Sequence, residues 1–276
     1  MKAALLGAAM LVAALPPRAE CQMTTGRVVW HDLVTPDLVQ AKAFYGGLFG
    51  WTWRAPSEGK GVTYVVAEMA GVAIGGLAES GDDKGSGSQW IPYFAVSDLK
   101  RSVKVADDSG AKVIVAPTTT GSWHDESALL ADAQGAVFGL MKPGAEPNDS
   151  AGHIINGWLW LELWTSNVDA AVPFYERLLG YQGRIIRVGG QPYTLMERDS
   201  LPRAGVRQIA AKGVRPNWLP TIRVADVDSM VARAVALGGR VIMAPRADVR
   251  EGTVAIIADP MGAALTLQEW TSEQRK

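Results

Sequence analysis

Residues 35–51 read TPDLVQAKAFYGGLFGW, and residues 165–181 repeat this pattern as TSNVDAAVPFYERLLGY. Self-similarity at a long, fixed separation is typical of a duplicated structural unit. The apolar side chains of the first copy recur at helical spacing, which predicts an amphipathic helix over residues 37–48. Its apolar face consists of Leu38, Ala41, Phe44, Tyr45 and Leu48.

Two further segments repeat at a similar separation. Residues 90–117 return at residues 218–245, keeping the patterns Trp-x-Pro, Val-x-Asp and Val-Ile-x-Ala-Pro, and the turn Asp-x-x-Gly-Ala at Asp132 returns at Asp259. The repeats predict two domains, over residues 26–143 and 157–271. A linker containing Gly, Pro and Asn, residues 144–156, joins them.

Each domain itself divides into two similar halves. In the first domain we expect helices over 37–48 and 99–109, and strands over 27–34, 62–69, 72–78, 90–96, 112–116, 127–132 and 136–141. The order is βαβββ twice per domain, so the fold class is α+β, with four such units in two curved mixed sheets. Asp37, Asp98 and Asp226 occupy N-cap positions of predicted helices, and we interpret them as structural.

The motif D-x-x-x-A-x-x-F-Y-x-x-L-F-G-W, the hairpin after it, the second βαβββ unit and D-x-x-G-A-x-x-x-L together resemble the vicinal oxygen chelate superfamily. That superfamily includes glyoxalase I, extradiol dioxygenases, and bleomycin- and fosfomycin-resistance proteins. The resemblance extends over nearly the whole chain after the amino-terminal segment. It implies two tandem domains of this fold and says little about the activity.

The composition excludes some classes of function. With 27 Lys+Arg against 28 Asp+Glu, the net charge of −1 gives no basic field for nucleic acid. The single cysteine cannot form a disulfide within the chain, and the sequence has three histidines but ten tryptophans. The chain is therefore poor in the soft metal ligands and rich in large aromatic side chains.

The amino-terminal segment resembles a secretory signal peptide. A run of small apolar residues over 3–15 follows Lys2 and ends at Pro16, and it is shorter than the about 20 residues that a membrane-spanning helix needs. We expect residues 1–21 to be removed and the protein to be exported, either periplasmic or secreted. Two alternatives remain: Cys21 as the lipidated first residue of a lipoprotein, and translation that begins at Met23.

The resemblance also identifies positions where metal-using members carry ligands. Those in the first strand of each unit are Trp30, Ile91, Trp160 and Leu219, and those in the late strands are Gly139 and Thr266. None suits a divalent metal, and shifting the alignment by one residue adds only His31. We therefore expect no metal and no other cofactor in either domain, with one hairpin position per domain left unassigned.

Alternation along the strands predicts which side chains point into the concave cup of each domain. Candidate ligand-binding residues in domain one are Trp30, Asp32 and Tyr93. Those in domain two are Trp160, Glu162, Trp164, Thr221, Arg223, Thr266, Gln268 and Trp270. Aromatic walls with a few polar groups suit a small aromatic or cationic molecule. Alternatively, the tryptophans only fill the cups and Glu162 pairs with Arg223.

Candidate acid–base groups are few. His31 shares a strand face with Val29 and Leu33 and is expected to be structural, packed against the helix. His124, beside Asp125 on a loop at the mouth of the first cup, and Glu162 are the weak catalytic candidates. His153 in the linker is expected to be inert.

Three hypotheses for the function follow. The leading one is an exported, metal-independent protein that binds a small molecule in its Trp-lined cups, as a bleomycin-resistance-like protein would. The second is a glyoxalase-like lyase or isomerase, or a dioxygenase, with Glu162 or His124 as the base. The third is a non-catalytic structural or antigen-like envelope protein. Whether the domains pair within one chain or in a homodimer stays open.

Overall fold

Two eight-stranded mixed sheets form the protein in the computed structural model, which describes residues 25–54, 63–80, 87–118, 126–143 and 154–270. The elements of sheet A are β1 (Val28–Thr35), α1 (Leu38–Phe49), β2 (Thr52–Arg54), β3 (Tyr64–Met69), β4 (Val72–Glu79), β5 (Gln89–Ala95), α2 (Leu99–Asp108), β6 (Lys112–Thr118), β7 (Glu126–Ala131) and β8 (Val137–Lys142). Its strand order is β2-β3-β4-β1-β5-β8-β7-β6.

Sheet B repeats this order with β10-β11-β12-β9-β13-β16-β15-β14. Its elements are β9 (Trp158–Thr165), α3 (Val168–Leu179), β10 (Gln182–Val188), β11 (Gln191–Arg198), β12 (Leu201–Gln208), β13 (Asn217–Val224), α4 (Val227–Ala236), β14 (Arg240–Met243), η2 (Arg250–Gly252), β15 (Val254–Ala258) and β16 (Ala264–Glu269). The four predicted βαβββ units are confirmed. Two units join in each sheet, through the antiparallel pairs β1–β5 and β9–β13.

The helices begin where the sequence predicts. The side chains of Asp37, Asp98 and Asp226 accept hydrogen bonds from backbone N–H groups three residues later. Asn167 does the same for α3. Each side chain satisfies one of the N–H groups that a helix leaves unpaired at its start. No helix within the described ranges is long and apolar enough to cross a membrane.

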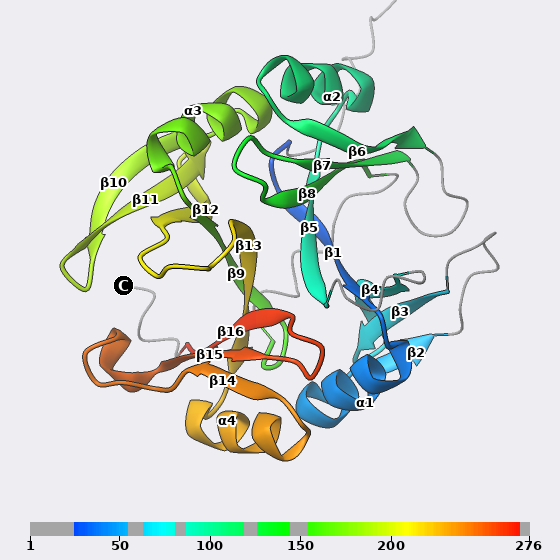
Figure 1. Cartoon of the computed structure of the whole chain (residues 1–276), viewed down its shortest axis with the longest axis vertical. Helices are drawn as coiled ribbons and strands as arrows, with labels where there is room; N and C mark the ends of the chain where they lie inside the picture. Colours follow the sequence, from blue (N-terminus) through cyan, green and yellow to red (C-terminus); the bar gives the residue numbers. More distant parts are fainter. Residues whose placement is uncertain (1–24, 55–62, 81–86, 119–125, 144–153, 271–276) are drawn as a thin grey trace, which may run out of the picture.

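The buried cores cross the boundary between the two sheets. One cluster combines α1 and the back of the first unit with α4 and the back of the fourth unit, and a second cluster does the same for α2 and α3. Figure 1 shows α2 beside α3 and α1 beside α4, with β1, β5, β9 and β13 between these helix pairs. Each domain thus completes its core with side chains of the other, within one chain.

The repeated sequence motifs form the contact between the domains. Tyr45 on α1 donates to Asp259 Oδ2 at 3.2 Å and accepts from Trp90 Nε1 at 2.9 Å. The matching set exchanges the roles of the two domains. Tyr175 on α3 donates to Asp132 Oδ2 at 3.0 Å and accepts from Trp218 Nε1 at 3.1 Å. The Oδ1 atom of each Asp accepts two N–H groups of its own turn.

The residue after each L-x-G motif makes a second reciprocal contact. Trp51 Nε1 donates to the carbonyl of Asn156, immediately before domain two, at 3.0 Å. Tyr181 donates its hydroxyl to the carbonyl of Gly26, at the start of domain one. Gly26 and Asn156, which supply the two carbonyls, both have positive φ. In each of the two pairs, one contact runs from domain one to domain two and the other runs back, as in an approximate twofold arrangement.

His31 is buried, but its partner differs from the prediction. A bulge in the β1–β5 pairing lies between Val28 and Trp30, and Val29 packs with the cluster of Ile91, Tyr93 and Met141. The His31 ring instead stacks on Trp158 of domain two, with ring centroids 4.0 Å apart. Complete burial lowers the pKa of His31 to about 3, although the nearby Asp32 opposes this shift.

Candidate ligand-binding cup

A cavity of about 200 Å³, partly open to solvent, lies on the face of sheet B away from its helices, and we call it cup two. Six of the predicted residues line it: Trp160, Glu162, Trp164, Thr221, Thr266 and Gln268. The sequence reasoning missed six others: Arg207, Met243, Val249, Arg250, Val254 and Ile256. The alternation along β9, β13 and β16 thus predicts the residues that form the floor of the cup. The missed residues come from neighbouring strands and from the segment after β14.

Glu162 is held by donors from three strands, β9, β11 and β12. Its Oε2 accepts Trp164 Nε1 at 2.6 Å and lies 3.5 Å from Arg207 Nε, and the carboxylate also accepts a hydrogen bond from Tyr193. The alternative interpretation paired Glu162 with Arg223, whereas the structure places Arg207 beside Glu162. The parallel pairing of β12 with β9 places Arg207 opposite Trp164, and this register is a long-range property that β9 alone does not reveal.

Tyr193 connects the aromatic wall to this carboxylate. Trp160 Nε1 donates to its hydroxyl at 2.9 Å, and the Arg207 guanidinium lies over its ring, 5.2 Å from the centroid. Burial, reinforced by the nearby Glu162, raises the pKa of Tyr193, so it stays a neutral donor. A Cβ at Gly205 would lie 1.6 Å from this hydroxyl, so only glycine fits there.

The same arrangement occurs in domain one. Trp30 Nε1 donates to Asp32 Oδ1 at 2.8 Å and to the Tyr64 hydroxyl at 3.0 Å, and Tyr64 donates to Asp32 Oδ1 at 2.8 Å. A Cβ at Gly76 would lie 1.8 Å from the Tyr64 hydroxyl. The signal in the sequence is the pair of glycines at equivalent positions of β4 and β12, each following a tyrosine in the preceding strand.

The cups differ where β5 meets β8 and where β13 meets β16. In domain one Tyr93 lies opposite Gly139, and a Cβ on Gly139 would approach the Tyr93 ring to 2.1 Å. Tyr93 also donates a hydrogen bond to the buried Asp32. In domain two the opposed pair is Thr221 and Thr266, and both line the cavity. Two small hydroxyl side chains leave open the space that the Tyr93 ring fills in domain one.

Arg250 reaches the cup from a left-handed turn. Arg250, Glu251 and Gly252 have φ values of 44°, 57° and 82°, an unfavourable region for the first two residues. The turn is closed by Gly252 N–H to the Val249 carbonyl at 3.1 Å and by the Thr253 hydroxyl to the Arg250 carbonyl at 2.6 Å. Arg250 Nη1 donates to Gln268 Oε1 at 2.9 Å. Strained backbone of this kind is common at functional sites.

Comparison with known proteins identifies the fold family. A model of the glyoxalase/bleomycin resistance protein/dioxygenase superfamily matches residues 26–140, and a model of the glyoxalase-like domain matches residues 160–267. The anthracycline biosynthesis protein DnrV of Streptomyces peucetius is 30% identical over 258 residues, covering 88% of this chain and 93% of DnrV. The chain belongs to the glyoxalase/bleomycin resistance protein/dioxygenase superfamily.

Two further proteins are similar to this chain. The putative glyoxylase CFP32 of Mycobacterium tuberculosis is 29% identical over 264 residues, covering 94% of this chain and all of CFP32 (100%). Among solved structures, the 2,3-dioxygenase LapB from Pseudomonas sp. KL28 superimposes with a TM-score of 0.59 at 14% identity, covering 90% of this chain and 93% of LapB. The likeness to LapB concerns the fold alone.

Cup two does not offer the donor set that a metal-using member of the superfamily would need. Glu162 is the single carboxylate among its described lining residues, and Arg207 and Trp164 already contact it. The amide oxygen of Gln268 accepts from Arg250. In the part of the chain that the structure describes, no three His, Cys, Asp or Glu side chains gather in one group. Two guanidinium groups beside one paired carboxylate do not suit a divalent cation.

Two predicted site residues are described but do not line cup two. Arg223 and Trp270 are half-buried and are not among the described residues that line cup two. His124 lies outside the described residues, as do His153 and residues 1–21. The remaining candidates, Trp30, Asp32 and Tyr93, belong to the hydrogen-bonded cluster inside domain one.

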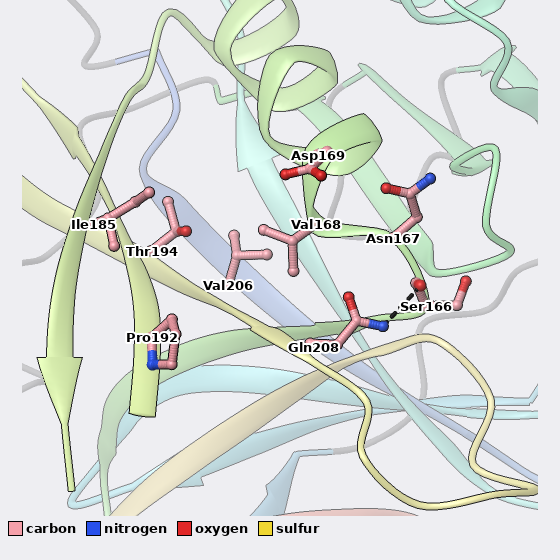
Figure 2. Close-up of a pocket in the computed structure, with 9 residues that line it drawn as sticks. All are labelled: Ser166, Asn167, Val168, Asp169, Ile185, Pro192, Thr194, Val206 and Gln208. Carbon is pink, nitrogen blue, oxygen red and sulfur yellow. Dashed lines mark hydrogen bonds between the residues drawn. The ribbon is translucent and has the colours of Figure 1, made fainter. Parts of the chain in front are cut away.

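A second hollow, of about 320 Å³, lies on the helix side of sheet B, outside the cup. Figure 2 shows Ile185, Pro192 and Thr194 of the β10–β11 hairpin facing the start of α3, where Gln208 bonds to Ser166. Ile185 is 77% exposed, so this wall is open to solvent. The hollow is larger than cup two, but it has neither aromatic walls nor a cationic side chain among its described residues.

Proposed function

We propose that this member of the superfamily binds a small aromatic molecule in cup two, and that binding needs no metal. The observation that carries the proposal is the cavity walled by Trp160 and Trp164, with the hydroxyls of Thr221 and Thr266 on its floor. Tryptophan offers a large, rigid stacking face, and a few convergent polar groups fix the orientation of a bound molecule.

The volume of the cavity limits the ligand. Drug-sized ligands occupy pockets of about 300–1,000 Å³, and an apolar cavity of about 150 Å³ accepts one benzene ring. At about 200 Å³, cup two matches a molecule with one or two fused rings. A larger polycyclic compound would place only one end in the cup.

The names of the relatives are consistent with small-molecule function. One relative is named for anthracycline biosynthesis, and another is called a putative glyoxylase. Both match nearly their whole length. They support a search among aromatic metabolites and antibiotics, with aldehyde–thiol adducts as the enzymatic alternative.

The geometry favours binding over catalysis by Glu162. A general base needs a lone pair directed at its substrate, but donors from Trp164, Tyr193 and Arg207 surround this carboxylate. These contacts hold Glu162 in place as part of the wall. Turnover of a thiol adduct by the unaltered protein, with loss of this turnover in the Glu162→Gln variant, would instead establish the lyase hypothesis.

Calorimetric titration of the purified full chain tests the proposal. The panel contains naphthalene derivatives, an anthracycline and a methylglyoxal–glutathione adduct, each with and without a chelator. We expect one- or two-ring aromatics to bind, chelator to have no effect, and Trp160→Leu to weaken binding by about tenfold or more through loss of stacking. Trp270→Leu is the matched control and retains binding. Absence of binding by every aromatic compound would favour the structural envelope hypothesis.

We also propose that the protein is exported after removal of residues 1–21. The apolar run that ends at Pro16 supports this proposal. Cell fractionation with sequencing of the mature amino terminus tests it. Export as a soluble protein predicts an unmodified amino terminus in the periplasm or medium, a lipoprotein predicts acylated Cys21, and a cytosolic chain that begins at Met23 contradicts export.

A further inference from the structure

We propose that cup two selects a carboxylate-bearing aromatic ligand and that Arg250 binds the carboxylate. This inference rests on the proposed function and names the chemical class of its ligand. It starts from the charges that face the cavity: Glu162, Arg207 and Arg250 among the described lining residues.

Two of these charges neutralise each other. Arg207 Nε lies 3.5 Å from Glu162 Oε2, and both side chains are largely shielded from solvent. Arg250 differs, because its guanidinium donates to the neutral amide oxygen of Gln268. Among the described residues, no carboxylate forms an ion pair with Arg250. The cup thus carries one positive charge that a neutral hydrogen-bond acceptor holds in place.

The position of this charge suits recognition. Gln268 lies on β16, two residues from Thr266 on the same face, so its bond with Arg250 holds the guanidinium beside the polar floor of the cup. The closed left-handed turn at Arg250–Gly252 anchors the backbone of Arg250 outside the sheet. A ring stacked on Trp160 or Trp164 would direct a ring substituent toward this guanidinium.

The planar guanidinium selects the substituent. Its N–H groups match the two oxygens of a carboxylate, and such charge-assisted pairs are stronger than neutral hydrogen bonds. A cationic aromatic would meet two guanidinium groups and no unpaired carboxylate among the described lining residues. The cup therefore disfavours the cationic ligands that tryptophan walls alone would accept.

Three probes with one ring system test this inference: 2-naphthoate, 2-naphthamide and 2-naphthylmethylammonium, titrated calorimetrically at neutral pH. We expect naphthoate to bind at least about tenfold more tightly than the amide, as one charge-assisted hydrogen bond would give, and the ammonium compound to bind most weakly. Arg250→Gln should reduce naphthoate binding to the level of the amide and leave amide binding unchanged. Arg246→Gln removes a cation from the same segment that is paired with Asp248, and it should change neither.

The outcomes separate this inference from the proposed function. Equal binding of naphthoate and naphthamide by the unaltered protein overturns the role of Arg250 while the aromatic site stands. Equal weakening of both probes in Arg250→Gln also overturns it, because that result assigns Arg250 to the shape of the cup. Failure of all three probes to bind refutes the proposed function itself.

Discussion

At the residue scale, two pairs of opposed side chains account for the difference between the cups. Tyr93 and Gly139 in domain one correspond to Thr221 and Thr266 in domain two. A large ring over a glycine fills the concave face, whereas two threonines leave a cavity. Because the surrounding strands have the same register, the two pairs should be exchangeable.

Exchanging the pairs gives the first prediction. We expect the double variant Thr221→Tyr/Thr266→Gly to fold and to lose aromatic binding by about tenfold or more, because the new ring occupies the stacking space. Calorimetric titration and thermal unfolding measure both effects. The single variant Thr221→Tyr is the control, since a ring facing Thr266 would clash and lower stability. Retained binding in a folded double variant would contradict the assignment of the cavity.

The second prediction concerns His31, whose folded-state pKa lies near 3 against 6.5 in the unfolded chain. Between these values the unfolded chain binds a proton that the folded chain excludes, so stability falls as pH falls. The loss is about 1.4 kcal/mol per pH unit below pH ~6. Urea unfolding of the unaltered protein and His31→Phe at several pH values should show a difference in unfolding free energy with this slope. A difference independent of pH would show that the pKa of His31 is the same in the folded and unfolded chains.

At the element scale, close approach between strands depends on two glycines. Gly76 on β4 and Gly205 on β12 lie against the hydroxyls of Tyr64 and Tyr193, which come from the adjacent strands β3 and β11. The strands themselves are predictable from their apolar alternation. Which glycine lies against which tyrosine depends on the pairing of strands, so it required the structure.

Adding a methyl group at these glycines gives the third prediction. Gly205→Ala and Gly76→Ala should each lower the unfolding free energy by about 1–3 kcal/mol, because the tyrosine must leave its hydrogen bonds. Gly205→Ala should also weaken ligand binding, since Tyr193 supports Trp160 and Glu162. Gly46→Ala on α1, where the nearest atoms lie at 3.4 Å, is the control and should be neutral or slightly stabilising. Equal effects of all three variants would contradict this account.

At the scale of the whole molecule, the duplicated motifs hold the domains together. Burial raises the pKa of Asp132 and of Asp259, and the reciprocal hydrogen bonds from Tyr175 and Tyr45 oppose these shifts. The conformation of each turn and the contact between domains depend on the same carboxylates. The unfolding of the two domains should therefore be cooperative.

A double-mutant cycle gives the fourth prediction. Tyr45→Phe and Asp259→Asn should each destabilise the chain by about 1.5–3 kcal/mol, with a coupling energy of about 0.5–3 kcal/mol. Tyr45→Phe combined with Asp132→Asn should be additive, because those side chains belong to different contacts. Urea unfolding of the six proteins measures these terms. Coupling in the second pair instead of the first would show that the contacts lie within domains.

The sequence by itself determined the four βαβββ units, the capping side chains such as Asp37, and the inward-facing residues of β9 such as Trp160. These features follow from periodicities of 2 and 3.6 residues, which are local. It did not identify Arg207 or Arg250 as cup residues, and the partner that it considered for Glu162, in the alternative interpretation, was Arg223. Strand register across β12 and the path of the segment after β14 depend on long-range packing.

The tertiary structure alone also decided what the repeated motifs contact. The sequence shows that Tyr45 and Asp259 belong to repeats, but only the packing of α1 against the fourth unit brings them together. A repeat records that each unit must bury the same apolar face. Burial of apolar surface is non-directional, so the face alone does not specify which unit covers it. That choice depends on the free energy of the whole core, to which both domains contribute here.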